Sequence, residues 1–138
     1  MKLHLLLLFS IIFISCNRQP VEDISNLNGY WEIEKVTFPS EETKTYKINT
    51  VIDHFSLETD STGIRQKVMP KFDGRFVNLE EFENFSIKKE GGKLFIYYNN
   101  EGNTRKEEII LLTKGKFGVK NDQDKEYYYK RFEKFSVK

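Results

Sequence analysis

Few residues of this 138-residue chain have the types and spacing that catalysis or metal binding requires. His54 is the only histidine after the first fifteen residues, and its neighbour Asp53 would point to the opposite face of a strand. Asp122, Asp124 and Glu126 alternate like calcium ligands, but their segment lacks the glycine that a calcium loop needs for its turn. We therefore predict no catalytic residues, no metal site and no cofactor, and a protein that is not an enzyme.

The single cysteine, Cys16, directly follows an apolar N-terminal segment. Lys2 precedes the apolar run 3–14, and this order is typical of a secretory signal peptide. As a helix the run would span roughly 18 Å, too short for a bilayer core of about 30 Å. With the small residue Ser15 before Cys16, the segment resembles a bacterial lipoprotein signal. The resemblance implies that residues 1–15 are removed and that Cys16 is acylated, which would make the membrane a partner through the lipid.

The residues after Cys16 bear on where such a lipoprotein would lie. By the same resemblance, Asn17 in place of aspartate favours the outer membrane over retention at the inner membrane. The segment also lacks the acidic cluster that sends some lipoproteins of Bacteroidota to the cell surface. We expect the protein to face the periplasm, with exposure at the cell surface left open. Residues 16–26, polar and containing Pro20, are expected to form the lipidated cysteine and its tether.

The composition of the remaining chain favours a sheet protein without affinity for nucleic acid. Removal of residues 1–15 lowers Lys+Arg from 22 to 21, equal to the 21 Asp+Glu, so no net charge attracts a polyanion. Eighteen of the twenty aromatic residues lie after residue 15, and aromatic side chains suit a pleated, half-buried surface. Without a second cysteine, the domain must be stable through its core alone.

Residues 27–138 show strand patterns separated by turn residues, and no long segment has a helical period. Strands are expected at 30–38, with a bulge near Glu34, and over 45–57, with a break near Asn49. Further strands are expected at the ranges 64–69, 81–88, 93–98, 109–112, 117–120 and 126–135, and the range 72–79 is expected to contain a tight turn at Asp73-Gly74 and then a short strand. Short turns between consecutive strands indicate an all-β, up-and-down antiparallel barrel of about eight strands, because closure removes exposed edges.

The opening of the first expected strand, Gly29-Tyr30-Trp31, resembles the Gly-x-Trp motif of the lipocalin family. Lipocalins also carry an arginine near the last strand that packs across this tryptophan, and Arg131 has the matching position. A guanidinium over an indole would stabilise the join between first and last strands by about 0.5–2 kcal/mol. As a whole, the chain is similar to the small lipocalin-like lipoproteins of Bacteroidota. Trp31 could alternatively be a core aromatic residue at the start of a strand.

Two functions follow from these observations. On the last strand, Tyr127 and Tyr129 share one face, which would either fill the barrel or line a ligand cavity. We expect first a non-catalytic binding protein for a small apolar or amphipathic molecule. The alternative is an accessory protein of the envelope that uses a packed barrel as a scaffold. Loops such as 60–63 or 99–103 would then bind a partner protein.

Overall fold

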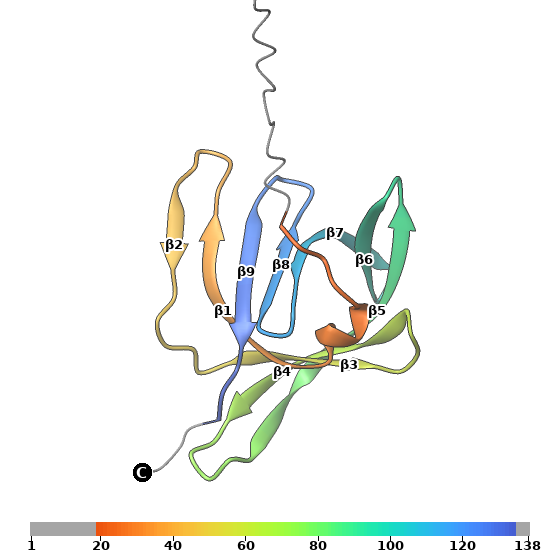
Figure 1. The fold of residues 1–138 in the computed structure, drawn as a ribbon. Coiled ribbons are helices and arrows are strands. Elements are labelled where there is room, and N and C mark those ends of the chain that lie inside the picture. Colours follow the sequence, from red (N-terminus) through yellow and green to blue (C-terminus); the bar gives the residue numbers. More distant parts are fainter. Residues whose placement is uncertain (1–18, 135–138) are drawn as a thin grey trace, which may run out of the picture.

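The computed structural model describes residues 19–134, except for the side chain of Glu80. Cys16 and the expected signal segment lie outside the described residues. A short 3-10 turn precedes nine strands in the described range (Figure 1). The elements are η1 (Ile24–Leu27), β1 (Gly29–Thr37), β2 (Thr43–Thr45), β3 (Ile52–Leu57), β4 (Thr62–Pro70), β5 (Phe76–Glu90), β6 (Lys93–Asn100), β7 (Asn103–Leu112), β8 (Lys116–Lys120) and β9 (Glu126–Arg131).

The strands form one antiparallel sheet that closes on itself. From β3 to β9 each strand pairs with the next, and β9 pairs along β1 from Trp31↔Arg131 to Thr37↔Glu126. On its other side, β1 pairs first with β3 and then with the short β2. Eight strands therefore close the barrel, and β2 is an added strand beside the end of β1 (Figure 1). The expectation of an all-β, up-and-down barrel of about eight strands is confirmed.

Local irregularities bend the longer strands around the barrel. The pairing of β1 with β9 shifts between Ile33 and Lys35, at the place where the apolar alternation of the sequence slips. Such a bulge bends β1 and increases its local twist. β1 pairs with β9 along one edge and with β3 and β2 along the other. The bulge that the sequence predicts near Glu34 is thus present.

The hairpin of β4 and β5 differs from the sequence-based expectation. A short strand within 72–79 was expected to be separate from the strand at 81–88, whereas Phe76–Glu90 is one 15-residue strand. Its register against β4 shifts between Gln66↔Phe82 and Val68↔Asn78, so β5 holds two extra residues there. This bulge replaces the expected break, because it bends β5 without ending it. The outer part of the hairpin projects from the barrel (Figure 1).

The apolar part of the interior is filled by the protein's own side chains. Phe55 contacts Phe85 and Phe117 edge-on at 5.8 and 5.5 Å between ring centroids, and Phe117 also packs on Trp31 and Tyr129. The buried cluster consists of Leu27, Trp31, Phe55, Phe85, Ile87, Ile96, Tyr98, Ile109, Leu112, Phe117, Val119 and Tyr129. Large aromatic side chains can fill a barrel of eight strands, so this half is a packed core.

Candidate functional site at the polar end of the barrel

One end of the barrel is closed by η1 and by the residues of the lipocalin resemblance. The Trp31 indole N–H donates to the Leu27 carbonyl oxygen at 2.8 Å, which ties β1 to η1. The Arg131 guanidinium carbon lies 3.9 Å from the Trp31 ring centroid. Arg131 also donates to the backbone carbonyls of Asn26, Asn28 and Lys114. These contacts join the start of the fold to its last strand.

Gly29 lies directly against this arginine. Its φ of +118° is a conformation that L side chains rarely adopt, and a Cβ there would lie 2.5 Å from Arg131 Nη1. The position therefore requires glycine, both for its backbone conformation and for the space beside the guanidinium. Gly29, Trp31 and Arg131 thus form one cluster at the closed end.

At the other end of the interior, charged side chains take the inward-facing positions. Asp53 on β3 is 3% exposed and accepts from Arg65 Nε on β4 at 2.9 Å. Lys67, two residues further along β4, places its Nζ 2.8 Å from the same Asp53 oxygen. Burial alone would raise the pKa of Asp53, but the two cations outweigh it and hold this pKa below its usual value.

A second charged group faces the first across the interior. Arg105 on β7 donates two hydrogen bonds to Glu83 on β5, at 2.8 and 3.1 Å. Its Nε lies 3.7 Å from Glu107, the next inward residue of β7. Burial raises the pKa of Glu107, although Arg65 and Arg105 oppose the shift. The Arg65 guanidinium lies between the two groups, with Nη1 3.9 Å from Glu83.

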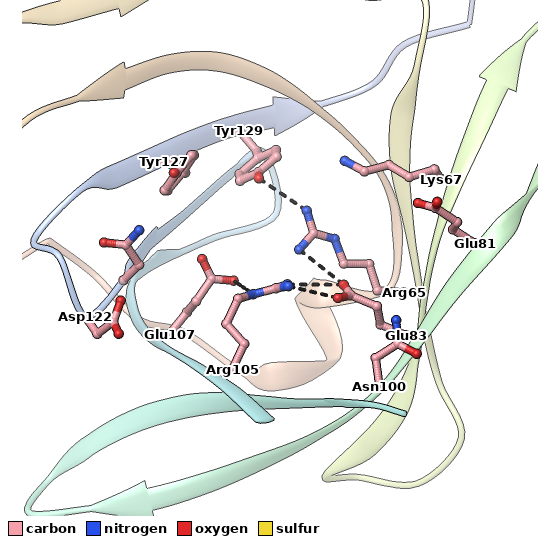
Figure 2. A pocket seen from close by; sticks show the side chains of 11 residues that line it. Arg65, Lys67, Glu81, Glu83, Asn100, Arg105, Glu107, Asp122, Tyr127 and Tyr129 are labelled. Carbon is pink, nitrogen blue, oxygen red and sulfur yellow. Dashed lines mark hydrogen bonds and ion pairs between the residues drawn. The ribbon is translucent and has the colours of Figure 1, made fainter. Parts of the chain in front are cut away.

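These side chains surround a cavity of about 430 Å³ that is open to solvent at this end of the barrel (Figure 2). Strands β4, β5, β7 and β9 provide most of the lining, and the end of β6 and the β8–β9 turn complete it. The lining residues are Arg65, Lys67, Glu81, Glu83, Asn100, Arg105, Glu107, Asn121, Asp122, Tyr127 and Tyr129. Such a lining suits hydrogen bonding to a polar group far better than burial of a hydrocarbon.

The tyrosines singled out from the sequence both line this cavity. The Tyr129 hydroxyl accepts from Arg65 Nη2 at 3.5 Å, and burial raises its pKa. Tyr127 lies beside it, nearer the mouth (Figure 2). Tyr129 also packs on Phe117, so it belongs to the core and to the cavity at once. On this face of β9, Tyr129 therefore helps to fill the barrel, and both Tyr127 and Tyr129 line the cavity.

The histidine considered first has another role. His54 stacks on Tyr30 with ring centroids 4.2 Å apart, on the face of β3 opposite the buried Asp53. Its pKa is lowered by burial. Nothing in the described residues 19–134 groups three or more His, Cys, Asp or Glu side chains that could hold a metal. The same residues contain no helix that is long and apolar enough to cross a membrane.

Sequence reasoning missed the charged residues of the cavity. In the sequence, these charged residues stand at the alternate positions of a strand that also carry buried apolar residues. Glu83 lies two residues before Phe85, and Arg105 and Glu107 lie four and two residues before Ile109. Alternation places these residues on the same face as the buried apolar ones. The local pattern alone does not distinguish such inward charges from solvated ones, so the polar end of the barrel was not predicted.

Together, the closed strand order, the packed end and the open cavity define a small antiparallel barrel with one closed end and one open end. The profile of the lipocalin-like domain family matches residues 27–119. The chain belongs to this lipocalin-like family, which confirms the family resemblance of its sequence. No curated protein matches the chain.

Solved structures show distant similarity. A lipocalin-like protein from Bacteroides uniformis shares 10% identity with a TM-score of 0.49, covering 78% of this chain and 99% of that one. A redesigned β-barrel shares 17% identity with a TM-score of 0.44, covering 83% of this chain and 99% of the other.

Proposed function

We propose that this protein is a non-catalytic binding protein that holds the polar part of a small amphipathic molecule in the cavity at the open end of its barrel. The observation that carries this proposal is the lining of the cavity: charged side chains, buried or half-buried, face a space of about 430 Å³. The packed aromatic cluster fills the other part of the interior with the protein's own side chains. An apolar tail would then lie toward the mouth, on the ring of Tyr127.

Native mass spectrometry tests this function directly. The sample is the mature chain 17–138, exported without the lipid and purified under mild conditions from its source envelope. It contains every residue that the structure describes. A reproducible added mass that is lost on denaturation is the expected result, and the mass identifies the ligand. Protein that is uniformly free of added mass, and that binds nothing from an extract of the same envelope, would contradict the proposal.

The proposed site of action is the outer membrane, on its periplasmic face, with the acylated Cys16 as anchor. Several acyl chains on one residue would hold a protein stably, because a single chain binds a membrane only marginally. Incorporation of radiolabelled palmitate tests the anchor. Wild-type protein should take up label that Cys16→Ser does not, and equal labelling of the two would reject lipidation at this residue.

A scaffold function is the second candidate, and a surface feature favours it. The hairpin of β4 and β5 carries Phe72, Val77 and Phe82, which are 81%, 44% and 53% exposed. Exposed apolar side chains that gather on one projecting element are a common feature of protein-binding surfaces. A photo-crosslinking amino acid at position 72 would give one dominant protein adduct in native envelopes if this hairpin binds a partner. Diffuse or absent adducts would argue for the binding protein alone.

A further inference from the structure

Glu107 is a buried carboxylate with almost no bonding partner. Its residue is 7% exposed, and its one ion pair is the 3.7 Å approach of Arg105 Nε, which is too long for a hydrogen bond. No hydrogen bond reaches its side chain from the residues that the structure describes. No fully buried side-chain oxygen of the described residues lacks a hydrogen-bond partner, so the free Glu107 oxygens reach the open cavity, where they are available to a donor on a bound molecule.

Arg65 has the complementary property, because the donors at the end of its guanidinium make only long contacts with protein groups. Its Nε is engaged by Asp53, but Nη2 reaches the Tyr129 hydroxyl only at 3.5 Å and Nη1 lies 3.9 Å from Glu83. The side chain is only 12% exposed, so bulk water does not replace these partners freely. Glu107 and Arg65 both line the cavity, one with free acceptors and the other with donors that make only long contacts (Figure 2).

The other charges deep in the cavity are paired with one another, whereas Glu81 and Asp122 also belong to its lining. Asp53 is held by Arg65 and Lys67, and Glu83 receives two hydrogen bonds from Arg105. A ligand carboxylate placed at Arg65 would lie beside Glu83 and near Glu107. A ligand ammonium placed at Glu107 would meet the positive charges of Arg105 and Arg65. Either charged group would disturb these ion pairs, and like charges at close range in a buried site repel strongly.

A hydroxyl group meets both requirements, because it donates one hydrogen bond and accepts others. Resting on the proposed function, we infer that the ligand presents a neutral, polyhydroxylated head group, such as a sugar or polyol, with Glu107 as the main acceptor and Arg65 as a donor. Asn100 and Asn121 at the mouth add amide groups that both donate and accept. The ring of Tyr127 offers a flat face for the C–H side of a sugar.

Three probes with the same eight-carbon tail test the head group: octyl β-D-glucopyranoside, octanoate and octyltrimethylammonium. Each is titrated, below its micelle concentration, into the isotopically labelled mature chain, and binding is followed by NMR shifts of the amides of β4 and β7. We expect the glucoside to shift the amides around Arg65 and Glu107 at the lowest concentration. Tighter binding of octanoate or octyltrimethylammonium at these residues would overturn the neutral head group while preserving the proposed function. Failure of all three probes to shift cavity residues would overturn both.

Substitutions at Glu107 test its role. Glu107→Gln keeps an acceptor of nearly the same shape, so glucoside affinity should fall by no more than about threefold. Glu107→Leu removes the acceptor without emptying the site, and affinity should fall about tenfold. Glu108→Leu is the matched control, because Glu108 follows on the same strand and pairs outside the cavity with Lys93 and Lys120. Unchanged affinity in Glu107→Leu, or an equal loss in the Glu108 control, would overturn the assignment.

Discussion

Substitution of Arg131 by methionine tests whether the closed end is a main source of stability. Methionine keeps an apolar stem of similar length over Trp31 but removes the guanidinium. The substitution therefore deletes a cation–π contact at 3.9 Å and the hydrogen bonds to the carbonyls of Asn26, Asn28 and Lys114. Those three carbonyls come from two segments that lie far apart in the sequence.

The expected loss follows from these contacts. Each hydrogen bond at this partly exposed site is worth about 1 kcal/mol, and the cation–π contact adds about 1 kcal/mol. Arg131→Met should therefore lower the free energy of unfolding by about 3–4 kcal/mol, a large share of the roughly 5–15 kcal/mol typical of a domain. The melting temperature should fall by about 10–15 °C.

Urea unfolding of the mature chain, followed by tryptophan fluorescence, measures this loss because Trp31 is the only tryptophan. Arg75→Met is the control: Arg75 lies in the β4–β5 turn, and the side-chain hydrogen bond and ion pair given for it within residues 19–134 go to Asp73, two residues away, so its loss should be below about 0.5 kcal/mol. A loss below about 1 kcal/mol in Arg131→Met, or equal losses in both variants, would refute this account of the closed end.

A double-mutant cycle with Gly29→Ala isolates the contact between the two residues. Alanine at position 29 is strained by the backbone and clashes with Arg131 Nη1, so the single variant should lose about 2–3 kcal/mol. In the Arg131→Met background the clash is gone and only the backbone strain remains, about 1 kcal/mol. Additive losses would show that the close approach of Gly29 to the guanidinium is energetically unimportant.

Three further predictions concern the interior. Asp53→Asn leaves Arg65 and Lys67 without their shared carboxylate and should lower stability by about 3–5 kcal/mol at pH 7. Because the pKa of Asp53 is lowered in the fold, its stabilisation is complete above pH 3.8 and is lost as the pH falls further, so acid titration should bring variant and wild type together. Glu107→Gln should raise the free energy of unfolding by about 1 kcal/mol at pH 8. Because the pKa of Glu107 is raised in the folded state, this gain should disappear as the pH falls toward 4.5. A gain that stays constant with pH would contradict the assignment. Gly63→Ala should cost about 2–3 kcal/mol by thermal melting, because its Cβ would lie 2.3 Å from the Ser56 carbonyl oxygen, and a near-neutral effect would show that the strands relax easily.

The sequence was sufficient for the architecture because the signals involved are local. Alternation of apolar residues and turn residues such as Gly91 and Gly92 determine where strands begin and end, and short connections make consecutive strands pair. Closure was predictable in principle, since Trp31 and Arg131 have types and positions that suit a contact between first and last strands. The continuous β5 was not, because its bulge opposite Gln66 depends on pairing with β4 rather than on any local pattern.

The candidate site was only partly predictable, for a physical reason. Tyr127 and Tyr129 are recognisable in the sequence as aromatic residues on one face of a strand. Arg65 and Glu107 are charged, and charged residues are typical of solvent-exposed positions. Which charged residues of a strand point inward depends on phase, and which of them meet depends on register across strands that are distant in the sequence. Arg65 reaches Tyr129 across 64 residues of chain, a contact that no local pattern encodes.

The distribution of these groups separates stability from binding within one barrel. At the closed end, Arg131 satisfies backbone carbonyls and stacks on a buried indole, so each contact favours the folded state. At the open end, Glu107 has no hydrogen-bond donor from the described residues and faces the open cavity, so its partial desolvation opposes folding. An arrangement that lowers stability is expected where side chains serve a ligand rather than the fold. On the proposed function, the packed end supplies the free energy that lets Glu107 remain without a protein donor until a ligand binds.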